Sequence, residues 1–154
     1  LMGDKVYSSR ELKERYKVKI LGKLSAGKKV GAIDAWLNRL EGRACNVDEA
    51  VEYKLIAANV ENYAGDMKKI LVTGSADAGV LAHAVEALKS ELGEIQVVAG
   101  NNMLEDVQTV RELPECDGVI LVEQCGVSKY SVVEAEIEKV FDLKKYVVGC
   151  VVFE

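Results

Sequence analysis

A loop bounded by two glycines, Gly74-Ser-Ala-Asp-Ala-Gly79, has the spacing of the first half of a phosphate-binding loop. In the complete pattern, G-x-x-x-x-G-K-[ST], backbone N–H groups surround the phosphates, the Lys reaches the β- and γ-phosphates, and the hydroxyl holds Mg²⁺. Here the last two positions are Val80 and Leu81, which supply neither a charge nor a metal ligand. We therefore expect a degenerate loop without nucleotide chemistry. The term glycine loop below denotes Gly74, Ser75, Ala76, Asp77, Ala78 and Gly79.

A second loss concerns the carboxylate that ends a buried strand and organises Mg²⁺ in such enzymes. The expected strand 95–99 runs into Gly-Asn-Asn, with no Asp or Glu at its end. Glu105 and Asp106 come later, in the first turn of an expected helix, where a carboxylate interacts favourably with the helix dipole. Phosphoryl transfer depends on positioned positive charge. The two losses together predict no enzymatic activity, no bound metal and no cofactor.

Two alternatives retain a ligand. The run Gly22-Lys-Leu-Ser-Ala-Gly27-Lys28-Lys29 has a lysine at the right spacing, although Lys29 replaces the hydroxyl and a basic, glycine-rich linker is the simpler interpretation. A divergent ATP-binding tyrosine kinase or ATPase would recruit Lys28 or residues of a partner. A metal-free sensor would instead bind another anion in the glycine loop.

The remaining polar residues of interest lie near strand ends. Asp77 occupies a candidate helix N-cap, and the single histidine, His83, is interpreted as structural or exposed. Gly126 and Ser128 follow the expected strand 118–123. Ligands of open α/β sheets bind outside the carboxyl ends of the strands. These two residues therefore form the best remaining candidate for a ligand or partner loop.

Buried, β-branched runs alternate with helical patterns over most of the chain, which indicates βαβ units and a mainly parallel sheet. We predict a shortened α/β fold of the P-loop NTPase (Rossmann-like) type, with helices flanking the sheet. The strands are expected at 70–73, 95–99, 118–123 and 146–153. The apolar helix positions are Val80, Leu81, Ala84, Val85, Leu88 and Leu92, and then Val133, Ile137, Val140 and Phe141. Ser131 and Glu134 fit a capping box for the second of these helices.

The N-terminal part reads differently. A small strand at 18–21 is followed by a flexible, glycine-rich run, and residues 1–30 are predicted to be a linker to a single domain over residues 31–154. The family resemblance described below implies that this linker is membrane-proximal. Two helical segments open that domain. The first has Ile33, Trp36, Leu37 and Leu40 on one face, and the second has Val51, Leu55, Ile56 and Val60.

Composition narrows the function classes. The chain has 154 residues, 49% of them apolar, and a net charge of -5 without a basic stripe, which argues against a nucleic-acid partner. Its four cysteines show no metal-ligand spacing and are expected to be free thiols. We find no apolar run long enough to span a bilayer. The chain opens Leu-Met-Gly-Asp, so it is expected to be a soluble piece of a longer protein, and the missing membrane segment then says nothing about that protein.

Several of these pieces, in this order, resemble one family. It comprises the tyrosine-kinase domains of bacterial capsule and exopolysaccharide assembly and the chain-length determinant proteins joined to them. Residues 6–22 resemble the segment after the second membrane helix of a chain-length determinant, and residues 68–75 resemble the strand leading into Walker A. Cys116-Asp-Gly-Val-Ile-Leu-Val-Glu-Gln-Cys-Gly-Val-Ser128 is similar to the family's D-G-V-I-L-V-x-R-x-G-x-T, and residues 146–154 resemble its closing strand.

The resemblance also identifies a possible oligomer contact. Tyr53-Lys54-Leu-Ile-Ala-Ala-Asn59 is similar to the Y-R-x-L-R-T-N helix that packs kinase subunits together, with Lys54 and Ala57 at the two arginine positions. Tyr53, Lys54 and Asn59 are therefore candidate contact residues.

The implied protein is a catalytically inactive relative. We expect a non-catalytic interaction or regulatory domain of a polysaccharide chain-length determinant, on the cytoplasmic side of the bacterial inner membrane. Such a protein takes part in capsule, exopolysaccharide or O-antigen biosynthesis and export. The partners expected from the resemblance are further copies of the chain, other polysaccharide-assembly proteins or a separate tyrosine kinase.

Overall fold

The computed structural model describes residues 4–25 and 49–154, which form an α/β fold around an all-parallel, five-stranded sheet. The strand order is β1-β5-β4-β2-β3. The strands are β1 (Ile20–Leu24), β2 (Lys69–Thr73), β3 (Gln96–Ala99), β4 (Gly118–Gln124) and β5 (Tyr146–Phe153). The sequence-based strands are thus confirmed, with shifts of one to three residues at their ends. The P-loop NTPase type of this fold stays a prediction.

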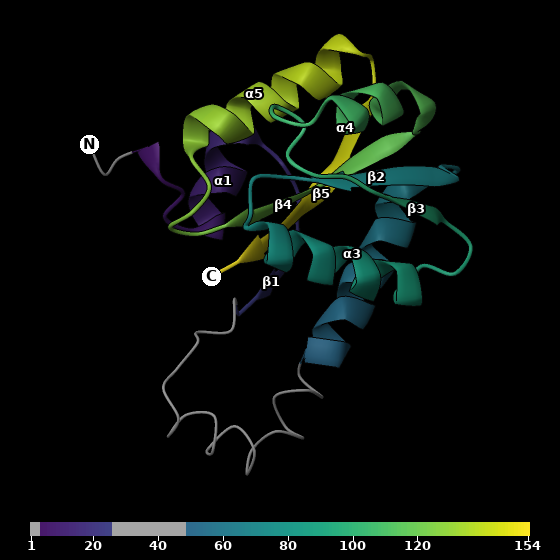
Figure 1. Cartoon of the computed structure of the whole chain (residues 1–154). Helices are drawn as coiled ribbons and strands as arrows, with labels where there is room; N and C mark the ends of the chain where they lie inside the picture. Colours follow the sequence, from purple (N-terminus) through teal and green to yellow (C-terminus); the bar gives the residue numbers. More distant parts are fainter. Residues whose placement is uncertain (1–3, 26–48) are drawn as a thin grey trace.

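Helices cover both faces of the sheet (Figure 1). One face carries α3 (Ala78–Glu91) and a helix over residues 49–64. The other carries α1 (Ser9–Tyr16), α4 (Val107–Glu112) with the short 3₁₀ helix η2 (Leu113–Glu115), and α5 (Tyr130–Asp142). The central strand β4 is buried on both faces, which explains why its sequence is a continuous apolar run rather than an alternating one.

The segment before β1 packs against the domain. Leu12 of α1 is fully buried in the core under α5, and β1 pairs with β5 at the edge of the sheet. The backbone of Val6 both donates to Ser128 O at 2.8 Å and accepts from Gly126 N at 3.0 Å. Residues 4–24, which fall within the predicted linker, therefore contribute to the core.

Two of the predicted apolar helix faces are partly wrong. On the helix over residues 49–64, Val51 and Leu55 are exposed, while Tyr53 is buried beside Ile56 and Val60. On α5, Phe141 at the C-terminal end is exposed. A period of three or four residues leaves a side chain at the margin of the apolar stripe free to face either way. By contrast, every apolar position predicted for α3 is buried or half-buried. The predicted helix around Trp36 lies outside the described residues.

The predicted capping box of α5 is also wrong. The helix begins at Tyr130, so Ser131 lies within the first turn rather than at the N-cap, which is Lys129. Asp4 takes over the capping role from a distant part of the chain. It accepts hydrogen bonds from Ser131 N at 3.2 Å and from Ser131 Oγ at 2.7 Å. Ser131 holds the pKa of the Asp4 carboxyl below its usual value through the side-chain hydrogen bond.

In the described part of the chain, no helix combines the length and the apolar character needed to cross a membrane.

Candidate functional site

The two loops singled out in the sequence meet at the carboxyl end of the sheet. Strand β2 leads into the glycine loop and then α3 on one face, whereas its neighbour β4 leads into α5 on the opposite face. Adjacent parallel strands whose connections leave in opposite directions form a topological switch point, where open α/β sheets bind ligands. Gly126 and Ser128 follow β4 and therefore lie at this end of the sheet, as predicted. Their role in binding a ligand stays a prediction.

Three N–H donors of the glycine loop have partners within the chain. Ser75 N donates to Glu123 Oε1 at 3.0 Å, Ala76 N to the carbonyl of Val122 at 3.3 Å, and Asp77 N to Gln124 Oε1 at 3.1 Å. All three acceptors belong to the last residues of β4. A phosphate bound by Ser75, Ala76 and Asp77 would need these same donors. These three residues therefore direct their N–H groups to the neighbouring strand.

Gly74 is required by this close packing. Its φ is +156°, and a Cβ at this position would lie 2.0 Å from the carbonyl oxygen of Val122. Gly79 is different, because it lies in the first turn of α3 and a Cβ there would meet nothing within 4 Å. Packing against β4 thus requires a glycine at position 74, whereas no contact within the described residues requires one at position 79.

Asp77 is the N-cap of α3, as predicted, but its side chain makes no capping hydrogen bond. Its backbone carbonyl still accepts the bond from Leu81 N at 2.9 Å that closes the first turn. Leu81, at the position of the Mg²⁺-binding hydroxyl, is buried in the core between α3 and the sheet. That side chain faces away from any ligand above the loop.

A carboxyl group lies directly beneath the glycine loop. Glu123, near the end of β4, is fully buried and accepts hydrogen bonds from Ser75 Oγ at 2.7 Å as well as from Ser75 N. Ser128, itself buried, lies close enough to Glu123 to favour the charged form of that carboxyl, and its Oγ accepts from Gln124 N at 2.9 Å. Two donors of Ser75 thus tie the glycine loop to the buried carboxyl, and Ser128 of the loop after β4 lies beside it.

A second carboxyl faces the first. Glu136 of α5 is also fully buried, and neither of its oxygens meets a donor from the described residues. Its neighbour is the carboxyl of Glu123, and the two groups lie close enough for each to shift the pKa of the other. Two carboxylates cannot bond to one another, because both only accept. The pair can form an O–H···O bond only if one of the two groups carries a proton.

Burial and mutual repulsion favour such a proton. Desolvation raises the pKa of Glu123, and desolvation followed by the charge of Glu123 raises the pKa of Glu136 well above its ordinary value. Cys150 of β5 lies close enough for the carboxyls to add to the effect of burial, which raises the pKa of its thiol. Neither Glu123 nor Glu136 forms an ion pair within the described parts of the chain.

The polar residues after β3 form a separate, self-contained group. Thr73 Oγ1 donates to the carbonyl of Asn101, and Thr109 Oγ1 donates to Asp106 Oδ2 at 2.6 Å. Asp106 is the N-cap of α4 and also accepts from Asn101 Nδ2 at 3.3 Å. The side-chain hydrogen bond of Thr109, followed by that of Asn101, lowers the pKa of Asp106. Asp106 thus has the role at a helix start that was predicted for it. No group of three or more metal-ligating side chains occurs within residues 4–25 and 49–154.

The three predicted contact residues of the helix over residues 49–64 have different environments. Lys54 is exposed, Asn59 donates to the carbonyl of Leu21 at 2.9 Å, and Tyr53 is buried against the sheet. Tyr53 and Asn59 therefore hold the helix on its own domain. The outward face instead presents Val51 and Leu55, together with Lys54. His83 is exposed, which was one of its two predicted environments, and its Nε2 lies 2.5 Å from Glu49 Oε1.

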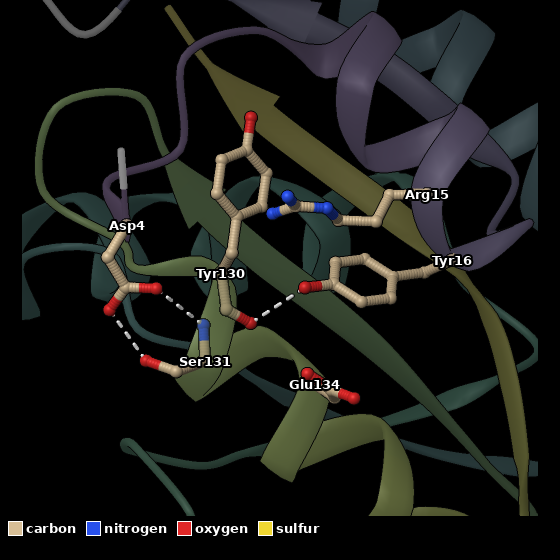
Figure 2. Close-up of a pocket in the computed structure, with 6 residues that line it drawn as sticks. All are labelled: Asp4, Arg15, Tyr16, Tyr130, Ser131 and Glu134. Atoms are coloured by element: carbon tan, nitrogen blue, oxygen red, sulfur yellow. Dashed lines mark hydrogen bonds between the residues drawn. The ribbon is translucent and has the colours of Figure 1, made fainter. Parts of the chain in front are cut away.

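A hollow on the opposite face lies between the N-terminal segment and the start of α5 (Figure 2). The guanidinium of Arg15 stacks over the Tyr130 ring, 4.3 Å from its centroid, and Tyr16 Oη donates to the carbonyl of Tyr130 at 2.9 Å. Asp4 and Ser131 close one side of it by the capping bonds (Figure 2). These groups bond to one another, so we interpret the hollow as part of the polar contact between the N-terminal segment and the start of α5.

Neither member of the buried pair was singled out from the sequence, although signals for both are present. Glu123 follows four consecutive apolar residues of β4, and Glu136 lies three residues after Val133 on the apolar stripe of α5. An ionisable residue on a core-facing position is the informative exception to burial patterns. What the sequence lacked was any indication that the two positions face each other.

Comparison with known proteins adds no family to this description. No family model matches the chain, and no curated protein matches it.

The different roles of the two glycines lead to a stability prediction. Gly74→Ala forces a methyl group into the carbonyl of Val122 and should lower the free energy of unfolding by about 1–3 kcal/mol. Gly79→Ala, in open space on a helix, should raise it by up to about 1 kcal/mol. Urea denaturation of both variants measures the two changes. Equal effects of the two substitutions would contradict this account.

The buried pair predicts a pH dependence of stability. Glutamates of the unfolded chain ionise near pH 4.5, whereas the folded pair retains a proton to higher pH. The folded state then binds more protons, so the free energy of unfolding should fall as the pH rises above this value. The slope reaches about 1.4 kcal/mol per pH unit for one retained proton. Urea unfolding at a series of pH values measures it.

The matched variants for this measurement lie two residues apart on α5. Glu136→Gln removes the proton that must be retained and should flatten the slope. Glu138→Gln makes the same substitution at an exposed position and should leave the slope as it is. A wild-type protein whose stability is level or rising above pH 5 would contradict the prediction.

Proposed function

We propose that this chain is a non-enzymatic interaction domain built on a nucleotide-enzyme type of scaffold. One observation carries the proposal: Ser75 N, Ala76 N and Asp77 N all bond to the end of β4. Val80 and Leu81 support it, because they replace the charge and the hydroxyl that phosphoryl transfer requires. Buried carboxyl groups below the loop further disfavour a phosphate above it.

The family resemblance suggests where such a domain acts. We propose that it belongs to a polysaccharide chain-length determinant and lies on the cytoplasmic side of a bacterial inner membrane. There it would organise or regulate the assembly and export of capsule, exopolysaccharide or O-antigen. Because residues 4–24 pack into the domain, a membrane anchor joined ahead of them would hold the whole sheet close to the bilayer.

The outward face of the helix over residues 49–64 is the surface that best fits an interaction role. Val51, Leu55 and Ala58 are exposed at positions i, i+4 and i+7, so they form one apolar stripe. Leu55 has 54% of its surface exposed although its neighbour Ile56 is fully buried. We propose self-association through this stripe, in place of the predicted contacts of Tyr53 and Asn59.

Nucleotide titration tests the non-enzymatic part. Calorimetry with Mg²⁺-ATP or Mg²⁺-ADP should detect no binding up to millimolar nucleotide, equivalent to weaker than about -4 kcal/mol. The half-buried Val80 can be changed to Lys without emptying the core, and Val80→Lys should remain equally silent because the loop donors stay occupied. Micromolar binding by the wild-type chain, or Mg²⁺-ATP turnover by it, would overturn the proposal.

Sedimentation tests the interaction surface. Leu55→Glu should weaken self-association by about tenfold or more, because it places a charge in the centre of the apolar stripe. Phe141→Glu is the matched control, since Phe141 has 60% of its surface exposed but lies on the other face of the sheet. A monomeric wild-type chain at high concentration, or equal effects of the two substitutions, would exclude this surface.

A further inference from the structure

The carboxyl pair Glu123–Glu136 joins three parts of the molecule at one point. Glu123 comes from β4 and Glu136 from α5, and Ser75 of the glycine loop bonds to Glu123 through both its N–H and its hydroxyl. The other groups that face the pair are the hydroxyl of Ser128 and the thiol of Cys150. Within the described residues no Lys, Arg or His forms an ion pair with either carboxyl.

This environment distinguishes sharply between one proton and none. With one proton, Glu136 gains a hydrogen bond to Glu123, although its two oxygens have no partner among the described residues otherwise, and Glu123 keeps its acceptors for Ser75. Without a proton, two negative charges face each other away from water, and no positive charge compensates them. Such a pair is stable only if at least one carboxylate becomes hydrated.

Water can reach the pair most directly through the glycine loop. Val133, Ile137 and Val140 of α5 are buried around Glu136, so that side is closed by the core. Ser75 above Glu123 is half-buried, and Asp77 beyond it is exposed. Hydration of Glu123 therefore requires Ser75 and its neighbours to leave the end of β4.

We propose that Glu123 and Glu136 bind one proton between them and that this shared proton holds the glycine loop closed against β4. As the pH rises, the proton leaves to solvent, the pair becomes two carboxylates, and the loop separates from the strand. No bond other than O–H is broken, and no co-reactant is needed. The inference rests on the buried pair and does not depend on the proposed function.

Carbon-detected NMR of the labelled chain tests the shared proton in the unmodified protein. The side-chain carboxyl resonances of Glu123 and Glu136 should titrate together, in a step displaced above the ordinary glutamate value of 4.5. The amide resonances of Ser75 and Asp77 should change with the same midpoint, since both N–H groups lose their acceptors. Two independent titrations near 4.5, or loop amides that do not follow the carboxyls, would overturn the proposal.

Variants separate the shared proton from a general effect of pH. Glu136→Gln supplies a permanent N–H donor to Glu123, so the step in the Ser75 and Asp77 amides should disappear and the loop should stay closed at high pH. Glu138→Gln, on the exposed side of α5, should leave the step unchanged. A step that persists in Glu136→Gln would overturn the proposal. If that variant does not fold, the wild-type titration alone decides.

Discussion

The hydrogen bonds from Ser75 to the buried carboxyl of Glu123 are the constraint on which the carboxyl end of this sheet depends. A carboxyl removed from water needs donors, and this one obtains them from the N–H and the hydroxyl of Ser75. The geometry of the glycine loop follows. The glycine loop must approach β4 closely enough for Ala76 N to reach Val122, and only a glycine at position 74 allows that approach.

The same constraint gives part of the phosphate-loop pattern acceptors within the fold. The pattern presents N–H groups that need an acceptor. In this chain the acceptors are the side chains of Glu123 and Gln124 and the carbonyl of Val122. A carboxyl oxygen is a good substitute for a phosphate oxygen at one N–H, but it is tethered to the strand below. The N–H groups of Ser75, Ala76 and Asp77 are therefore satisfied from inside the fold.

The strands and the outline of the site were predictable because they depend on local patterns. Continuous apolar runs identified β2, β4 and β5, and the two glycines identified the loop after β2. Contacts between distant segments were not predictable in this way. Asp4 caps α5 across 127 residues of sequence, and Glu136 meets Glu123 only because α5 packs on β4. The predicted helix faces were wrong at Leu55 and Phe141, which are exposed at the margins of their apolar stripes.

Cohesion at this end of the sheet also limits what the domain can do. The loop after β4, which was the best remaining candidate for a ligand, is joined to the N-terminal segment, since Val6 bonds to both Gly126 and Ser128. A ligand at the switch point would thus have to displace either this segment or the Ser75–Glu123 contact. The N-terminal segment is held there by the backbone hydrogen bonds of Val6. The Ser75–Glu123 contact is held by a buried carboxyl whose neighbour, Glu136, has no hydrogen-bond partner among the described residues. Of the two, the second is the contact whose strength changes with protonation, which makes it the place where the state of the solution can alter the surface of the domain.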